Sequence, residues 1–168
     1  MSWPGLRTWA RFLPGLLILA MLSVIASRTY TRQKRMSIIS KYGIDLYLLL
    51  IEQGFFPGTA AMITAQAAHE TANFTSYIFM FNNNPFGMKL PEVRRTTAYG
   101  EARGHAVYSS MESAALDYWL YYKDREYPSV WKDIDTFIAA LKAQNYFEAP
   151  LELYKSAVKK FYKVYFGA

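Results

Sequence analysis

A glutamate stands at the end of a run of small apolar residues in the segment AQAAHETANFTS, residues 65–76. The alanines before Glu70 would let a helix approach its neighbours closely, which places the end of that helix near the centre of the fold. A carboxyl group among apolar neighbours has a raised pKa, because ionisation there loses solvation, and it can serve as a general acid. Cleavage of a glycosidic bond needs such an acid at the leaving oxygen. The other interpretation is a solvent-exposed Glu in a last helical turn.

Metal chemistry has little support in this sequence. His69-Glu70 matches the start of a zinc-protease signature, but the second His that the signature requires is replaced by Asn73. The chain holds two His and no Cys, which excludes thiolate zinc sites, cysteine nucleophiles and disulfides. We therefore expect neither a metal nor a cofactor.

The positive charge belongs to the N-terminus and not to the rest of the chain. The net charge is +6, but the first 41 residues contain no acid and hold the basic residues Arg7, Arg11, Arg28, Arg32, Lys34, Arg35 and Lys41. Acidic residues outnumber basic ones by one over residues 42–168. This distribution argues against a nucleic-acid partner.

An uncharged apolar stretch, FLPGLLILAMLSVIA, covers residues 12–26 and is flanked by arginines. We predict that residues 1–35 form a membrane anchor with a basic linker, although the apolar core is shorter than the roughly 20 residues of a typical span. A signal peptide cleaved before Ser27, which would release a secreted protein, is the alternative. The excess of basic residues after the stretch favours a cytoplasmic location for the remainder of the chain.

The remaining residues, 36–168, are predicted to form one mostly helical α+β domain. Apolar residues recur at helical spacing over 36–53, 60–71, 111–123, 134–144 and 150–165, and Thr59 is the expected N-cap of the second of these helices. Residues 82–89, NNNPFGMK, predict a loop. Thr, Val and Tyr with two glycines predict one small β-hairpin within residues 92–108.

AQAAHETANFTS followed by FNNNPFGMK resembles the glucosaminidase family of peptidoglycan hydrolases, glycoside hydrolase family 73. HAVYSSMESAALDYWLYY and NYFEAPLELYKSAV are similar to further family segments, so the resemblance covers roughly residues 37–165. It implies a lysozyme-like fold, peptidoglycan glycan strands as the substrate, and Glu70 as the general acid. One departure is the family's Gly-Trp-Gly turn, which is replaced here by Ala72-Asn73-Phe74, with Phe74 as the candidate for the missing aromatic.

The resemblance also implies a set of substrate-binding positions. Asn83 and Asn84 would bond N-acetyl groups, Phe86 would pack on a sugar ring or in the core, and Gly87 would let the backbone come close. Gln66 lies one helical turn before Glu70 and is either a substrate contact or a buried amide satisfied by the protein. Tyr108, Tyr118 and Tyr146 fall on family positions where tyrosines face the groove, and Tyr146 is the one assigned to catalysis.

The second carboxylate of the family, where there is one, lies on the hairpin, which offers Glu92 and Glu101. Glu101, between two glycines at the expected hairpin tip, is the predicted catalytic residue of this pair. Hydrolysis by a base-activated water, assistance by the substrate's N-acetyl group, and lytic transglycosylation all remain open.

The sequence as a whole predicts a membrane-anchored peptidoglycan glycosidase. An endo-β-N-acetylglucosaminidase is expected, with a muramidase or lytic transglycosylase on the same fold as the alternative. Its location would be the bacterial envelope or the membrane of a phage virion, where other virion or envelope proteins would be partners. The rival from another class is an inactive glycan-binding or virion structural protein that has kept the fold.

Overall fold

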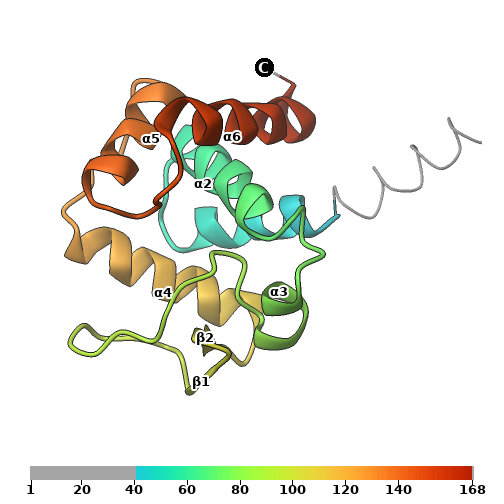
Figure 1. Ribbon diagram of the computed structural model, residues 1–168, viewed down its shortest axis with the longest axis vertical. Helices are drawn as coiled ribbons and strands as arrows, with labels where there is room; N and C mark the ends of the chain where they lie inside the picture. Colours follow the sequence, from blue (N-terminus) through green and yellow to red (C-terminus); the bar gives the residue numbers. More distant parts are fainter. Residues whose placement is uncertain (1–40, 168) are drawn as a thin grey trace, which may run out of the picture. The chain divides into compact units, whose positions relative to one another are not determined.

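The computed structural model describes residues 41–167, which form several helices and one short two-stranded sheet (Figure 1). The chain divides into two units, Met1–Ile38 and Ile39–Ala168, and the described residues belong to the second. The predicted anchor with its apolar core at residues 12–26 lies outside the described residues. Within residues 41–167, no helix combines the length and the apolar character that crossing a bilayer demands.

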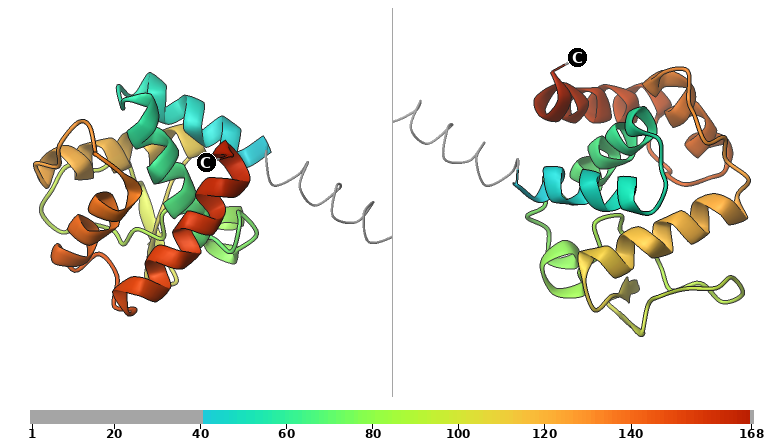
Figure 2. Two further views of the ribbon diagram at one scale, coloured as in Figure 1. Left: turned by 90° about the horizontal axis from the view of Figure 1, so that it is seen from above. Right: turned by 180° about the vertical axis from the view of Figure 1, so that it is seen from behind.

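The helix that ends in Glu70 runs through the middle of the described unit. Residues 41–52 are helical, and Gly54 ends that helix with a φ of +93°. Helix α2, Pro57–Glu70, follows, and its ten residues from 59 to 68 are all buried. Two views place α2 between α6 on one side and α4 on the other (Figures 1 and 2). The alanine-rich sequence thus allows the close packing of α2 against α6.

The start of α2 differs from the prediction. Thr59 is not the N-cap, because the helix begins at Pro57 and its N-cap, Phe56, makes no side-chain capping bond. Proline is well suited to the first helical position, since its missing N–H would have no partner there. The Thr59 hydroxyl instead donates to the Ser129 carbonyl at 3.0 Å, which ties α2 to the segment after α4.

The other helices match the predicted pattern, with one addition. The predicted helices over 111–123, 134–144 and 150–165 are observed as α4, Met111–Asp124, α5, Ile134–Ala143, and α6, Leu151–Phe166. The short helix α3, Tyr77–Asn82, was not predicted. Its first turn is capped by the Ser76 hydroxyl, which accepts from the Phe79 N–H at 3.2 Å.

The hairpin is present but shorter than the predicted segment. Strands β1, Gly100–Ala102, and β2, His105–Val107, pair antiparallel in the register Gly100↔Val107. The turn falls at Arg103 and Gly104, both with positive φ. Glu101 is therefore not at the tip: it lies within β1, opposite Ala106.

The asparagine run after α3 connects the hairpin to the following loop. The Asn84 amide donates to the Met88 and Ala106 carbonyls at 2.9 and 3.0 Å and accepts from the N–H groups of Phe86 and Met88. The Asn82 amide donates to the Ala102 carbonyl at 3.1 Å. These bonds satisfy the backbone of a segment too irregular to satisfy itself.

Candidate active site

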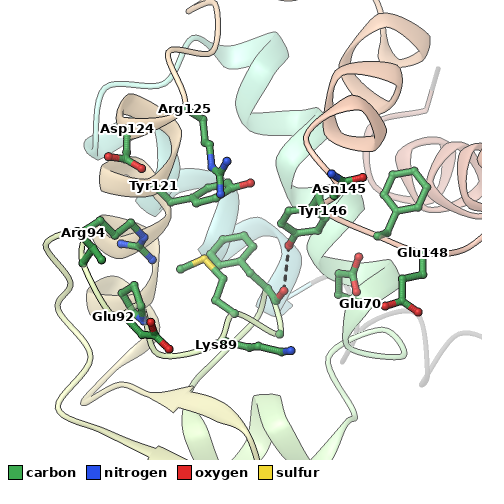
Figure 3. A pocket seen from close by; sticks show the side chains of 16 residues that line it. Glu70, Lys89, Glu92, Arg94, Tyr121, Asp124, Arg125, Asn145, Tyr146 and Glu148 are labelled. Carbon is green, nitrogen blue, oxygen red and sulfur yellow. Dashed lines mark hydrogen bonds between the residues drawn. The ribbon is translucent and has the colours of Figure 1, made fainter.

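A groove of about 730 Å³ opens at the C-terminal end of α2. Its lining comes from four parts of the chain: the end of α2, the loop over residues 86–94, the end of α4 with the residue after it, and the segment 145–148. Figure 3 shows charged side chains around this space, with Glu70 on one side and Arg94 and Glu92 on the other. The volume suits a few sugar units of an extended chain.

Glu70 is the last residue of α2 and lines the groove. The Tyr154 hydroxyl, from α6, donates to Glu70 Oε1. Burial raises the Glu70 pKa above its usual value, and the hydrogen bond from Tyr154 acts in the opposite direction. A carboxyl with a raised pKa at the surface of a groove meets the requirement for a proton donor near neutral pH.

Gln66 lies behind Glu70 and not in the groove. Its side chain has no exposed surface, and its Oε1 accepts from the Tyr118 hydroxyl at 2.9 Å. Tyr118, on α4, is also fully buried, and its ring lies 4.1 Å from that of Phe86. Neither Gln66 nor Tyr118 is part of the groove lining.

The segment 145–148 forms the wall beside Glu70. The Tyr146 hydroxyl donates to the Phe86 carbonyl at 3.0 Å, across the groove floor (Figure 3). The Phe147 ring stacks on the Tyr154 ring, with centroids 3.7 Å apart and planes nearly parallel. The ammonium group of Lys142 donates to the carbonyls of residues 147, 148 and 149 and so holds this wall in place.

The opposite wall is the loop that carries Lys89, Glu92 and Arg94. Arg94 pairs with the buried Asp117 of α4. One aromatic contact adds to this anchoring, because the Arg94 guanidinium lies 5.8 Å from the Tyr121 ring centroid of α4. The Arg125 guanidinium, at the end of α4, lies 5.5 Å from the same centroid. Arg94 in this wall is therefore held in place by α4, with its charge paired to Asp117.

Three other carboxylates line the groove with Glu70, and the predicted one is not among them. Glu101 is exposed on β1. Glu92, Asp124 and Glu148 do line the groove, and Figure 3 shows Glu148 on the same side as Glu70 and Glu92 on the far side.

The remaining predicted residues divide into lining and supporting positions. Phe86 and Gly87 line the groove, and Gly87 has a left-handed φ of +62°. Asn83 and Asn84 lie outside the lining: the Asn83 amide donates to the Tyr108 carbonyl at 3.0 Å. Tyr108 is fully buried and donates to Asp117 at 2.8 Å.

The turn after Glu70 is left-handed over three consecutive residues. Ala72, Asn73 and Phe74 have φ values of +47°, +67° and +60°. Ala72 and Phe74 stand at the two glycine positions of the Gly-Trp-Gly turn in the family that the sequence resembles, and glycine adopts positive φ without strain. The Phe74 ring is buried against Phe79, with centroids 5.2 Å apart, and is therefore a core residue and not a groove aromatic.

Sequence reasoning missed Tyr154, Phe147, Glu148 and Arg94. Tyr154 and Phe147 lie in the segment that resembles the family, but nothing in the sequence singles them out among 14 Tyr and 11 Phe. Glu148 could have been noticed, since it lies two residues after Tyr146 in the segment that resembles the family. Within residues 41–167, no cluster of His, Cys, Asp and Glu is arranged to hold a metal ion.

Comparison with known proteins gives one match. The model of the glucosaminidase family, described as mannosyl-glycoprotein endo-β-N-acetylglucosaminidase, matches residues 57–166. The matched part extends from α2 to α6 and so includes every segment that lines the groove. No curated protein and no solved structure matches the chain.

Proposed function

Because the chain belongs to the glucosaminidase family of glycoside hydrolases that act on peptidoglycan, we propose that it cleaves the glycan strand with Glu70 as the general acid. The observation that carries this proposal is the burial of the Glu70 carboxyl at the surface of a sugar-sized groove, with its pKa raised. The bond expected to break is the one after N-acetylglucosamine, in keeping with the family description.

In the first step, Glu70 gives its proton to the glycosidic oxygen while the bond from that oxygen to the anomeric carbon breaks. The electron pair of the bond leaves with the oxygen, which becomes the hydroxyl of the departing sugar. The positive charge that develops on the ring is then met by a water molecule or by the substrate's own N-acetyl oxygen. The carboxylates that line the groove, with Glu148 on the Glu70 side, favour this charge.

The second carboxylate determines which mechanism applies. Glu148 and Glu92 both line the groove, whereas Glu101, which the family resemblance suggests, would need the hairpin to move over the groove. If none of these residues is required, assistance by the N-acetyl group or lytic transglycosylation follows. Glu70 is the acid in every case.

The test is release of soluble fragments from purified peptidoglycan by the full chain and by Glu70→Gln. We expect the substitution to lower release by at least about a hundredfold, since a general acid typically contributes that much or more. Mass spectrometry of the products distinguishes the outcomes: a reducing N-acetylglucosamine end, a reducing muramic acid end or an anhydro end. A wild-type chain that releases nothing, or an active Glu70→Gln, contradicts the proposal.

We also propose that the chain is held at a membrane by residues 12–26, either of a bacterial envelope or of a phage virion. The uncharged length of this segment and the basic residues on both sides support the proposal. Fractionation of cells expressing the full chain, together with N-terminal sequencing, tests it. Recovery in the membrane with Met1 intact is expected, whereas a soluble product that begins at Ser27 would indicate a cleaved signal peptide.

A further inference from the structure

Four polar side chains form a line from α4 through α2 to the groove. The Tyr118 hydroxyl donates to Gln66 Oε1, and the Tyr154 hydroxyl donates to Glu70 Oε1. Tyr118 and Gln66 are fully buried, and Tyr154 is 4% exposed. Only Glu70, at the end of the line, reaches the groove.

The middle of this line contains a polar atom that lacks an ordinary partner. Gln66 Nε2 is buried and has no hydrogen-bond partner within residues 41–167. Burial and the neighbouring Glu70 charge raise the Tyr154 pKa, and the nearby Gln66 side chain acts against them. Because Gln66 precedes Glu70 by one turn on the same face of α2, its unpaired amide nitrogen lies toward the Tyr154 hydroxyl that Glu70 binds.

The order of donors and acceptors fixes the direction of the Tyr154 hydroxyl. With Oε1 of Gln66 occupied by Tyr118, the donor side of the amide faces the Tyr154 oxygen. A hydroxyl has a single proton, and a donor on one side leaves that proton for the acceptor on the other. The acceptor here is Glu70 Oε1.

We propose that Tyr154 is a positioning residue that keeps the transferable proton of Glu70 on Oε2, and that Gln66 and Tyr118 set the direction of the Tyr154 hydroxyl. Oε1 already accepts from Tyr154, so Oε2 is the oxygen left to carry the proton to the substrate. This inference rests on the proposed role of Glu70 as the acid.

The same bond becomes stronger as the reaction proceeds. Glu70 changes from a neutral acid to a carboxylate when it gives up its proton, and hydrogen bonds to ionised groups are stronger than those between neutral groups. Tyr154 therefore stabilises the transition state more than the ground state, which is the condition for a contribution to the rate. Stacking of Phe147 on the Tyr154 ring keeps the phenol in place for this task.

The first experiment compares Tyr154→Phe with Tyr162→Phe in the full chain. Both residues are on α6, but Tyr162 packs at the edge of the core, with its ring on Phe166, and is not part of the groove lining. We expect Tyr154→Phe to lower the rate at optimal pH by about tenfold to a hundredfold, the range for a hydrogen bond to a charged group. The alkaline limb of its pH–rate profile should move to higher pH, because the hydrogen bond from Tyr154, which lowers the Glu70 pKa, is lost. Tyr162→Phe should keep the wild-type rate and pH profile.

The second experiment tests whether the line acts as one unit. Tyr118→Phe removes the bond that orients Gln66, so it should reduce the rate less than Tyr154→Phe and shift the alkaline limb in the same direction. The double variant of Tyr118→Phe and Tyr154→Phe should lose no more rate than Tyr154→Phe alone, since both substitutions act through the Tyr154 hydroxyl. Circular dichroism melting establishes that the variants are folded, and Tyr118→Phe provides the test if Tyr154→Phe does not fold.

The possible failures can be told apart. An active Glu70→Gln overturns the proposed function itself. An inactive Glu70→Gln beside a Tyr154→Phe with the wild-type rate and pH profile overturns only the role of Tyr154. Additive losses in the double variant, or an unshifted pH profile in Tyr118→Phe, overturn the orienting role of Gln66 and Tyr118.

Discussion

The Arg94 guanidinium donates two hydrogen bonds to the Asp117 carboxylate, at 3.0 Å from Nη1 to Oδ1 and at 2.8 Å from Nη2 to Oδ2. The same carboxylate accepts from the Thr97 N–H at 3.1 Å and from the Tyr108 hydroxyl. One fully buried carboxylate on α4 therefore holds the loop that forms the far wall of the groove.

We expect Asp117→Asn to lower the free energy of unfolding at neutral pH by about 3 kcal/mol, because removing one partner of a buried ion pair leaves the other charge uncompensated. Urea unfolding followed by circular dichroism measures this loss. Asp135→Asn is the matched control: its carboxylate pairs with the exposed Lys159 of α6, and surface pairs contribute little. Equal losses in the two variants would contradict the anchoring role of Asp117.

The stability difference between the wild type and Asp117→Asn should depend on pH. Burial alone would raise the Asp117 pKa, but hydrogen bonds from Arg94, Thr96 and Tyr108 outweigh it, and the pKa lies below its usual value. The stabilisation is therefore present above the pKa of an unfolded Asp, about 3.9, and is lost as pH falls through the lower folded value. The unfolding curves of the wild type and of Asp117→Asn should therefore converge as the pH is lowered. A difference in stability that stays constant down to strongly acid pH would refute the prediction.

The contribution of Glu70 to stability should change with pH in the opposite direction. Its pKa is raised by burial, so the folded state favours the protonated form. The corresponding stability is present below the pKa of an unfolded Glu, about 4.3, and is lost as pH rises through the higher folded value. Glu70→Gln, a neutral substitute, should therefore melt at a higher temperature than the wild type at neutral pH, with the difference shrinking in acid. A variant that melts lower at neutral pH would show that the ionised carboxylate is well solvated.

The left-handed turn after the acid predicts a stabilising substitution. Ala72 has a φ of +47°, a conformation that costs a non-glycine residue roughly 1–2 kcal/mol. Ala72→Gly should thus raise the free energy of unfolding by about 1 kcal/mol, after allowance for the greater freedom of glycine in the unfolded chain. Ala143→Gly, at the exposed end of α5, is the control and should lower it by about 0.5–1 kcal/mol. A loss of stability in both variants would contradict the strain at Ala72.

The second carboxylate can be identified by parallel substitutions. Because Glu148 lines the groove on the Glu70 side, Glu148→Gln should lower fragment release by about tenfold or more, with melting unchanged. Glu101→Gln should leave release close to wild type, since Glu101 is exposed on β1 outside the lining. The reverse order would show that the hairpin moves over the groove in the complex with substrate. Wild-type release by both variants would favour assistance from the N-acetyl group.

The helices were predictable because their signals are local. The spacing of apolar residues predicted the bounds of α4, α5 and α6 to within a few residues. The short helix α3 was missed, since six residues are too few for a periodic pattern and the asparagines that follow dominate the composition. The start of α2 was misplaced because Thr59 is a good capping residue by type but is engaged by Ser129, far along the chain.

The site was predictable only in part, for a different reason. Glu70 could be singled out because its local sequence contrasts a buried run with an ionisable group. The partner that sets its chemistry, Tyr154, is 84 residues away along the chain. The amide of Asn84 appears in the sequence as a sugar-binding group, but its bonds to the hairpin and loop depend on tertiary structure. Contacts of this kind depend on tertiary packing, which a local sequence pattern does not predict.

The turn that follows Glu70 is held from the other end of the domain. Tyr165, in the last turn of α6, donates from its hydroxyl to Asn73 Oδ1 at 2.9 Å, and its ring lies 6.2 Å from that of Phe74. A backbone shape that glycine would adopt by itself is here imposed by these distant side chains. The last turn of α6 thus fixes the turn that leads out of Glu70. Under the proposed role of Glu70 as the acid, we expect a substitution of Tyr165 to lower the rate of glycan cleavage more than the affinity for the glycan.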